Sequence, residues 1–422
     1  MKVLYLTPQP LDGTRFTSVS FLEEELEALA DSGLDMHVLS ESGATSHDGS
    51  GGSRASGGST ARGAIRAHVI PPGRDVPEAI GTLGSLLKQI PRLGGGALTL
   101  PARTGFHFQR VERFAARVVR EEGIDVIHSH FGWPGGWGGI QASLATGIPV
   151  VATFRGMDLN LKLDFEYGLR RDRHFRTALP FLLRRAALTA YPSEYMRAKG
   201  LELGAPKDRT RVVLQGVDTE RFRPAGDSDR RALKRRLLGG TGKEALLLSV
   251  GMLVRHKGVH HTLDALSRLD RETDWTLVVC GEGPELKRLE EDAERLGLGS
   301  RIRFIGYVDR DRIPDYFAAA DIHVHSALFE AAGNVLLEAM ASGRPVVCSD
   351  AGGPPDYVVD GETGWIVPPA DPGAMALAIQ RLLDSPELAD RMGMRGRARA
   401  ERRLQYGAMI DRIRTVYREA IS

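Results

Sequence analysis

Cysteine is scarce in this chain, and neither sign of charge is in excess. The 422 residues include two cysteines, Cys280 and Cys348. Each ends an apolar run (TLVVC and RPVVC), which favours buried strand thiols over a disulfide or a catalytic pair. The 56 Lys and Arg residues nearly balance the 54 Asp and Glu residues. This composition argues against a nucleic-acid-binding protein and against an acidic tail.

Long hydrophobic runs are also missing. No window reaches the roughly 18 apolar residues that a membrane-spanning helix needs, so any membrane contact is expected to be peripheral. The opening MKVLYLTPQP contains a short apolar run that Pro8 breaks, and this run is too short for a signal peptide. With so few cysteines, a reducing cytosol is the expected compartment.

Short apolar runs alternate with helical patterns throughout the chain. Such runs between helices predict buried parallel strands. Two successive sets of this alternation predict an α/β protein with two Rossmann-like domains. The predicted strands are KVLYLT, DMHVLS, IRAHVI, DVIHSH, PVVAT, LTAY and TRVVLQ in the first half, and ALLLSVG, TLVVCG, RIRFIG, IHVHS and PVVCSD in the second.

The predicted domain boundary lies near GVDTERFRPAGDSD, where a strand ends and Pro224 breaks the chain. This gives an N-terminal domain of residues 1–222, a C-terminal domain of residues 223–404 and a final helix over 405–422. Residues 41–63 are rich in Ser and Gly and lack large apolar side chains, so we expect a disordered surface loop there.

Residues 18–32 show the predicted helical periodicity most clearly. The apolar positions recur on one side of the helix and the acidic positions on the other, which predicts a helix with one buried face. The apolar face comprises Val19, Leu22, Leu26 and Leu29, and the acidic face comprises Glu23, Glu24 and Glu27.

The stretch FEAAGNVLLEAMASG (residues 329–343) carries Glu330 and Glu338 among apolar and small residues. Gly333 and Asn334 predict a turn and an N-cap, followed by a helix over 335–342. A helix start that follows a parallel strand is where open α/β sheets bind ligands, and its free N–H groups suit a phosphate. Because a buried carboxylate without a partner is costly, we expect cations or ligand hydroxyls near both acids.

The E-x7-E spacing of these glutamates, followed by AMASGRPVV and GGPPDYVVDGETGWIVPP, resembles the retaining GT-B glycosyltransferases of the glycogen-synthase-like group 1 family. This resemblance implies two Rossmann-like domains facing a cleft, with the final helix packed on the N-terminal one. Further segments match the family in order: DVIHSH, IPVVATFRGMD, QGVDTERFRP, SVGMLVRHKG, VCGEGPELKRLE and FIGYVDRDRIPDYFAAADIHVHS.

The resemblance also implies a set of site residues in the C-terminal domain. Glu338 would bind the donor ribose, Glu330 would lie against the donor sugar, and Lys257 would stabilise the negative charge on the leaving phosphate. Arg255 is expected as a second catalytic cation, because Met252 stands where the family often has Arg. The remaining implied donor contacts, which include the N–H groups expected to hold the diphosphate, are Gly251, Val308, Gly333, Asn334, Val335 and Leu336.

A second set of residues would face the acceptor in the N-terminal domain. Arg155 stands where the family often has His, and its permanent charge suits a phosphate or an acidic acceptor. Asp158 matches the family, and the first strand–helix loop keeps one glycine, Gly13. His128 and His130 occupy alternate positions of one strand, so both rings can point to one side. We interpret them as part of the cleft wall or as polar core contacts rather than as a metal pair, because no third ligand follows at metal-site spacing.

These features predict a retaining hexosyltransferase that needs no metal or other cofactor. Its donor would be a nucleoside diphosphate sugar, with UDP or GDP as the nucleotide, and its acceptor hydroxyl would belong to a lipid-linked saccharide of a surface polysaccharide or to a small metabolite. Two alternatives stay open: another GT-B enzyme, such as a phosphorylase or an epimerase, and a weakly catalytic sugar-nucleotide-binding protein. The arginine-rich segment 169–185 is interpreted as a solvated helix with one core face, and its alternative role is docking on anionic lipid.

Overall fold

The computed structural model describes residues 1–6, 20–41, 65–70, 102–239, 244–270 and 272–422. These residues form two compact units, each with its own sheet and core. The predicted loop over 41–63, apart from Glu41, and the predicted cleft residue Gly13 lie outside the described residues. The first unit comprises Met1–Tyr191, Met196–Val213 and Ile410–Ser422, and the second comprises Pro192–Tyr195 and Leu214–Met409.

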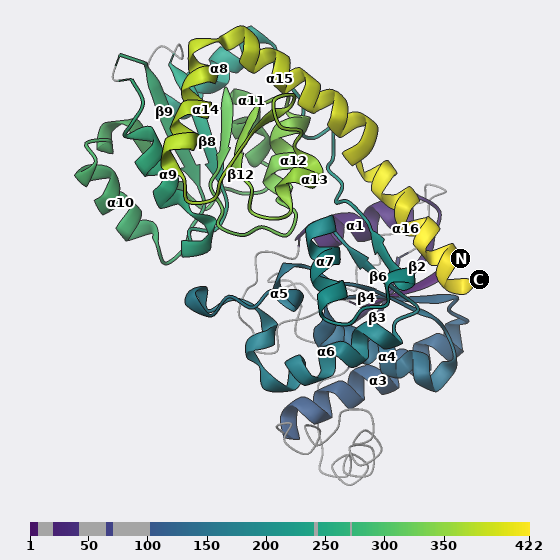
Figure 1. The fold of residues 1–422 in the computed structure, drawn as a ribbon. Coiled ribbons are helices and arrows are strands. Elements are labelled where there is room, and N and C mark those ends of the chain that lie inside the picture. Colours follow the sequence, from purple (N-terminus) through teal and green to yellow (C-terminus); the bar gives the residue numbers. More distant parts are fainter. Residues whose placement is uncertain (7–19, 42–64, 71–101, 240–243, 271) are drawn as a thin grey trace, which may run out of the picture. The chain divides into compact units, whose positions relative to one another are not determined.

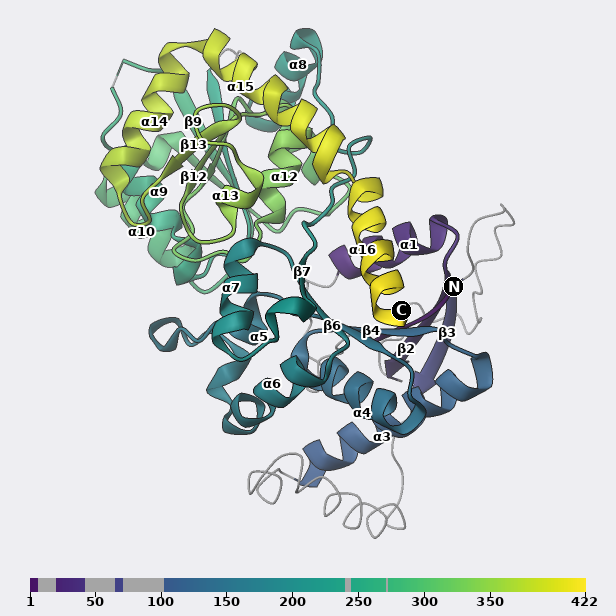
Figure 2. The ribbon, with the colours of Figure 1, turned by 45° about the vertical axis from the view of Figure 1, so that its right-hand side comes forward.

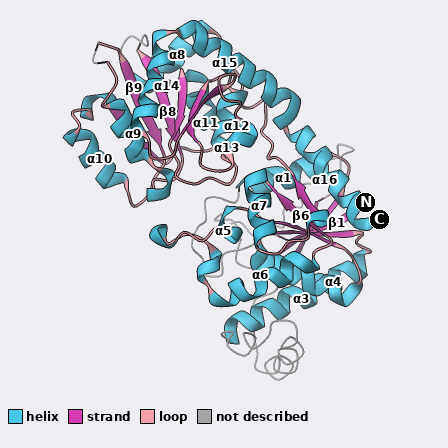
Figure 3. Ribbon diagram, in the orientation of Figure 1, coloured by secondary structure: helices cyan, strands magenta, loops and turns pink. Residues whose placement is uncertain are grey.

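The first unit contains a parallel sheet of seven strands in the order β3-β2-β1-β4-β5-β6-β7 (Figure 3). Every strand predicted for the first half of the chain is present. The strand order reverses between β1 and β4, and the crevice at such a point is the usual ligand site of a doubly wound sheet. The strands are β1 (Lys2–Leu6), β2 (Asp35–Glu41), β3 (Ile65–Ile70), β4 (Val126–His130), β5 (Val150–Thr153), β6 (Leu188–Tyr191) and β7 (Thr210–Val212).

Helices cover this sheet, and the end of the chain returns to it. In both ribbon views the last helix lies beside α1 (Figures 1 and 2), and Arg414 donates a hydrogen bond to the Ser32 carbonyl just after α1 (2.7 Å). Leu22 and Leu29 of α1 are buried, as their spacing predicted. The helices are α1 (Ser20–Asp31), α3 (Ala102–Glu122), α4 (Trp137–Thr146), α5 (Gly156–Leu159), α6 (Arg173–Arg185), α7 (Glu194–Glu202) and α16 (Tyr406–Ile421).

The boundary between the units differs from the predicted one. The second unit begins at Leu214 instead of residue 223. The reason is that Val217 and Phe222 are buried in the core of the second unit, and the Val217 N–H donates to the Leu404 carbonyl (2.8 Å). The segment at the predicted boundary therefore packs as part of the second domain.

The second unit contains a parallel sheet of six strands in the order β10-β9-β8-β11-β12-β13. Five of these strands were predicted, and the edge strand β13 was not. The two cysteines lie in β9 and β12, buried and without a disulfide, as predicted. The strands are β8 (Ala245–Val250), β9 (Trp275–Cys280), β10 (Ile302–Gly306), β11 (Ile322–His325), β12 (Val346–Ser349) and β13 (Gly364–Val367).

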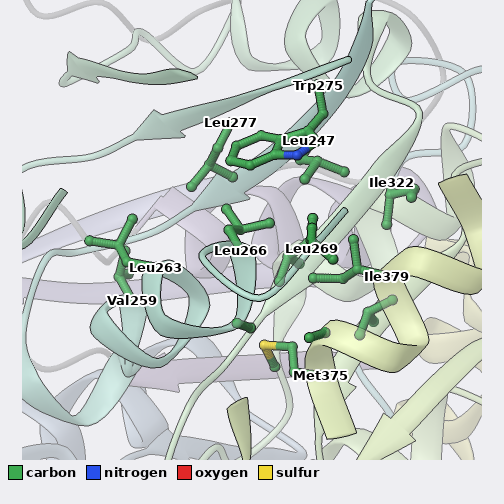
Figure 4. Packing of buried hydrophobic residues seen from close by; sticks show 14 of the residues in the cluster. Leu247, Val259, Leu263, Leu266, Leu269, Trp275, Leu277, Ile322, Met375 and Ile379 are labelled. Carbon is green, nitrogen blue, oxygen red and sulfur yellow. The ribbon is translucent and has the colours of Figure 1, made fainter. Parts of the chain in front are cut away.

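The core of this unit packs apolar side chains between the sheet and its helices. Figure 4 shows Trp275, Leu247 and Leu277 of the strands above Leu263 and Leu266 of α9. Within the described parts of the chain, no helix combines the length and apolar character that crossing a bilayer requires. The helices are α8 (Asp227–Leu238), α9 (Val259–Leu266), α10 (Leu286–Arg295), α11 (Ile313–Ala319), α12 (Asn334–Ala341), α13 (Pro354–Tyr357), α14 (Pro372–Asp384) and α15 (Pro386–Arg399).

Candidate active site

The predicted donor residues of the second unit gather at one edge of its sheet. Gly251 follows β8, Val308 follows β10 and Glu330 follows β11. Because parallel strands end at the same edge, these three positions share the carboxyl edge, where open α/β sheets bind their ligands. The helix α12 begins at the same edge, one residue earlier than predicted, because Gly333 takes the N-cap position with a φ of 88°.

Lys257, His325 and Glu330 form a tight polar cluster at this edge. The Lys257 ammonium donates to Glu330 Oε2 at 2.5 Å, and His325 Nε2 lies 3.2 Å from the same oxygen. The Glu330 side chain is 13% exposed and that of Lys257 is 23% exposed. Burial raises the pKa of Glu330, but the positive charge of Lys257 and the contact with His325 outweigh this and hold the pKa well below its usual range. Glu330 is therefore an anion at neutral pH.

The loop that carries Lys257 is fastened to the end of β11. The Ser326 hydroxyl donates to the Gly258 carbonyl (2.7 Å), and the Thr262 hydroxyl donates to Ser326 (2.8 Å). Gly258 adopts a φ of 68°, and an added Cβ would lie 2.1 Å from the Ser326 carbonyl oxygen. Only glycine fits this close approach, so the sequence HKG fixes where the Lys257 side chain starts.

Glu330 is held through its backbone as well. Its N–H donates to the Ala351 carbonyl (2.8 Å), and its carbonyl accepts from the Gly353 N–H (3.0 Å). The motif GGPPDY that follows β12 therefore supports the loop of the first glutamate. This contact gives a physical reason why both motifs occur in the same sequence pattern.

The start of α12 offers N–H groups to a ligand, with one amide already used. Gly333 makes no side-chain cap, and the Leu336 N–H donates to the Gly333 carbonyl (2.9 Å). The N–H groups expected to hold the diphosphate are those of Asn334, Val335 and Leu336, and of these Asn334 and Val335 are the better candidates. Glu338 lies one turn further on and is half-buried.

The remaining predicted residues differ in exposure. Arg255 is exposed and begins the short 3-10 helix that ends at Lys257. Met252 lies in the loop between β8 and this helix and is 50% exposed. Val308 is partly buried against the core. The assigned roles of these residues remain predictions.

Replacing Gly333 with alanine is expected to weaken nucleotide binding by about tenfold, which corresponds to about 1.4 kcal/mol. An added Cβ would lie 2.8 Å from Leu336 Cδ1, and the positive φ disfavours any side chain. Gly297→Ala is the matched control, because Gly297 has a φ of 71° but open space around it. Isothermal titration of both variants with UDP and GDP makes the comparison. Equal affinity in the two variants would mean that the Gly333 turn does not shape the donor site.

The first unit places a buried glutamate at the centre of its predicted cleft residues. Glu25 of α1 is 3% exposed. Its carboxylate lies 2.9 Å from Arg155 Nη2 and 3.1 Å from His130 Nε2, and it accepts from the Tyr5 hydroxyl (3.1 Å). Burial raises the pKa of Glu25, but its contacts with His130 and Arg155 outweigh this and hold the pKa well below its usual range. Burial lowers the pKa of His130, so Arg155 supplies the compensating positive charge.

Asp158 organises the backbone next to this cluster. Its carboxylate accepts from the Gly132 N–H (2.7 Å) and the Arg155 N–H (2.9 Å). Burial raises its pKa to about 7, although both N–H groups favour the anion. Asp158 thus caps the start of α5, and the structure brings Asp158, Arg155 and His130 together, as their expected place in one cleft requires.

His128 is a polar core contact, which agrees with one of its two predicted readings. Its ring nitrogens lie 2.6 Å from the Tyr417 hydroxyl and 2.8 Å from the Thr153 hydroxyl. Glu25, His128 and His130 come close enough together to hold a metal ion, so the sequence argument missed a third candidate ligand. However, both His128 nitrogens already have partners and Arg155 faces Glu25, which leaves this trio poorly suited to a cation.

Three residues of these clusters escaped the sequence analysis: Glu25, Tyr5 and His325. The signal for Glu25 was present, because it lies three residues after Leu22 and four before Leu29, both buried. That spacing puts it on the apolar face of α1. The signal for His325 was present too. His323 and His325 occupy alternate positions of the strand IHVHS, as His128 and His130 do in DVIHSH, so both rings were expected on one side of the strand.

Two Rossmann-like units, the second with a Lys–Glu–His cluster beside a helix start, define a protein of the GT-B class. Two family models match the chain: "Glycosyl transferases group 1" over residues 231–399 and "Glycosyltransferase Family 4" over residues 19–221. Together with the relatives below, they show that the chain belongs to the group 1 glycosyltransferases, as the resemblance predicted.

Curated relatives support this membership. The chain is 33% identical to D-inositol 3-phosphate glycosyltransferase of Acidothermus cellulolyticus, over 73% of this chain and 71% of that protein. It is 34% identical to GDP-mannose-dependent alpha-(1-6)-phosphatidylinositol monomannoside mannosyltransferase of Mycolicibacterium smegmatis, over 53% of this chain. That second match spans 59% of the relative's length.

Solved structures agree in fold. Sucrose-phosphate synthase of Thermosynechococcus elongatus superposes with a TM-score of 0.73 at 21% identity, covering 99% of this chain and 98% of that one. Anabaena Alr3699/HepE in complex with UDP gives 0.72 at 20% identity, covering 98% of this chain and 99% of that one. The predicted GT-B fold class is therefore confirmed.

Proposed function

We propose that this protein transfers a hexosyl group from a nucleoside diphosphate sugar to an acceptor hydroxyl, with retention of anomeric configuration. The observation that carries the proposal is the Lys257–Glu330 pair beside the start of α12. A cation and free helix N–H groups at one sheet edge suit a diphosphate, and a fixed carboxylate suits sugar hydroxyls. Glu338, one helical turn further, would bind the ribose.

The proposed chemistry needs a stabilised leaving group more than a general base. As the bond between the sugar and the diphosphate breaks, negative charge grows on the leaving phosphate. Lys257 would stabilise that charge, with Arg255 and the Asn334 and Val335 amides assisting. No metal or other cofactor is included in this proposal, because the leaving charge would be met by these groups.

The proposed acceptor is a lipid-linked saccharide or a small metabolite. Two relatives are named for these two kinds of acceptor, a phosphatidylinositol monomannoside mannosyltransferase and a D-inositol 3-phosphate glycosyltransferase. His130, Arg155 and Asp158 are the side chains of the first unit proposed to order the acceptor side. UDP and GDP stay the proposed nucleotides, since one relative is named for GDP-mannose and HepE was solved with UDP.

A peripheral membrane contact through α6 belongs to the same proposal. Its apolar residues, which include Phe175, Leu179 and Leu182, are buried in the first unit, as expected for a core-facing helix. Arg173, Arg176 and Arg184 are exposed, so any attraction to anionic lipid would be electrostatic. We propose a cytoplasmic place of action, which suits two buried thiols that form no disulfide.

A donor screen tests this function directly. Isothermal titration of the parent with UDP-, GDP- and ADP-sugars, with and without magnesium, should show one preferred donor whose binding needs no metal. Glu338→Ala should weaken that binding by about tenfold or more through the lost ribose contact, which corresponds to about 1.4 kcal/mol. Glu290→Ala, an exposed acid of the same unit, is the control and should bind as the parent does. Absence of binding in the parent, or equal loss in both variants, would contradict the proposal.

A further inference from the structure

Three potential metal ligands from three elements converge in the first unit. His37 lies in β2, His68 lies in β3, and Glu122 is the last residue of α3. His37 Nδ1 lies 3.0 Å from His68 Nε2 and 4.0 Å from Glu122 Oε2. One ligand atom from each residue lies within 4.8 Å of the other two.

Strand register explains the convergence. His37 pairs with Arg66 across the parallel β2–β3 ladder, and His68 lies two residues after Arg66. Alternate residues point to one face, so both histidines lie on the same side of the sheet. Their rings stack with centroids 5.2 Å apart. Lys2 donates to the Glu122 carbonyl (2.7 Å) and so fastens the end of α3 near this face.

The surroundings of His37 match those of a metal-binding imidazole. The His37 side chain is wholly buried. While Nδ1 faces His68 and Glu122, Nε2 lies 3.6 Å from Asp35 Oδ1. A carboxylate behind the second ring nitrogen is the usual outer contact of a ligating histidine. Among the described residues, His37 Nε2 and Asp35 Oδ1 have no hydrogen-bond partner, and the 3.6 Å between them is too long for a hydrogen bond.

We propose that His37, His68 and Glu122 bind a divalent transition metal ion of the zinc type. Two imidazoles and a carboxylate are a common donor set for such ions, with water as the fourth ligand. With metal–nitrogen bonds of about 2.0–2.1 Å, two ligand nitrogens lie about 2.9–3.4 Å apart, close to the separation in the structure. Glu122 is 31% exposed, which leaves a path for the ion. The site would join β2 and the edge strand β3 to the end of α3.

Arg66 is the competitor of the proposed ion. Its guanidinium lies 3.3 Å from Glu122 Oε2 and 3.9 Å from Asp35 Oδ2, and its side chain is 50% exposed. An entering cation would take over the Glu122 carboxylate and release the Arg66 guanidinium to solvent. Removing Arg66 should therefore strengthen metal binding, whereas a merely hydrogen-bonded histidine pair makes no such prediction.

Cobalt binding to the full chain tests the proposal without any measurement of sugar transfer. Chelator-treated protein is titrated with CoCl2, followed by visible absorption, and then with ZnCl2 in competition. The parent should bind one ion, His68→Gln and Glu122→Gln should lose about tenfold or more in affinity, and Arg66→Gln should gain affinity. His174→Gln, a histidine elsewhere in the same unit, is the control and should bind as the parent does.

Several results would overturn the proposal. These are absence of visible absorption in the parent, unchanged affinity in His68→Gln, or weaker binding in Arg66→Gln. Circular dichroism of each variant shows whether it is folded. A change at buried His37 could disrupt the sheet, so the test uses His68→Gln and Arg66→Gln, whose parent residues are half-exposed.

Discussion

Lys257→Ala is expected to lower the rate constant of sugar transfer by about 100- to 1,000-fold, the loss typical of removing one preorganised group that stabilises developing charge. The Lys257 ammonium is fixed 2.5 Å from Glu330, at the edge of the sheet where we propose that the donor diphosphate binds. Single-turnover rates with a saturating donor measure the effect on the chemical step. Nucleotide affinity, measured separately by titration, should fall much less than the rate.

Lys257→Ala should also change the stability of the folded protein. A second substitution separates this effect from the effect on the transfer rate. Without Lys257, the largely buried Glu330 carboxylate loses its cation and keeps the contact with His325, so folding stability should drop too. Lys257→Ala combined with Glu330→Gln removes the uncompensated charge. Stability should partly recover in the double variant while the rate should not.

Lys287→Ala is the matched control for the Lys257 experiments. Lys287 lies in α10 of the same unit, and its side chain is 90% exposed. Its removal should change neither rate nor stability measurably. If Lys257→Ala retained the rate of the Lys287→Ala variant, the assignment of Lys257 to the leaving phosphate would be wrong.

The strands of both sheets were predictable because buried parallel strands are short, continuous and apolar. KVLYLT and ALLLSVG carry this signal plainly, and each forms the strand that it predicted, β1 and β8. The strand β13 (GWIV) lacks it, because its middle residues Trp365 and Ile366 are only partly buried and glycine opens the run. An edge strand makes fewer core contacts, so its composition is less constrained.

The site was predictable where a motif fixes the backbone and less so where the fold brings distant residues together. Glu330 and Lys257 were found from motifs, and the structure brings them into contact across 73 positions of sequence. Glu25 was missed because it is the last of three consecutive glutamates, Glu23–Glu25, so its place on the buried face of α1 was hidden in that acidic run. Its partner Arg155 is 130 residues away, and only the sheet topology joins them.

This buried pair leads to the prediction with the largest expected effect on stability. Glu25→Gln should destabilise the first unit by about 3–5 kcal/mol, the usual effect of removing one partner of a buried ion pair. In this variant, Arg155 Nη2 would face a neutral amide where the parent has the Glu25 carboxylate. Its contact with the His130 ring would remain. Hydrogen exchange of the β1 and β4 amides, followed by mass spectrometry, reports the first unit alone.

Acid should reduce the difference between the parent and Glu25→Gln. The pKa of Glu25 is held below its usual range in the folded state, so its stabilising effect is complete above the unfolded pKa of about 4.3. As pH falls from there toward the folded pKa, the parent loses this stabilisation and the variant, which has no such proton to bind, does not. Exchange rates of the two proteins should therefore converge at low pH.

Glu27→Gln supplies the control, because Glu27 is an exposed residue of the same helix. It should change stability by less than about 0.5 kcal/mol. The double variant Glu25→Gln/Arg155→Gln should cost less than the sum of the two single variants, because the two charges are in contact in the parent and each single change removes that contact. Additive costs, or a Glu25→Gln variant as stable as Glu27→Gln, would show that the contact contributes little. In that case the positions of His130 and Arg155 would depend on Asp158 and the backbone, because Asp158 holds the Gly132 and Arg155 amides without Glu25.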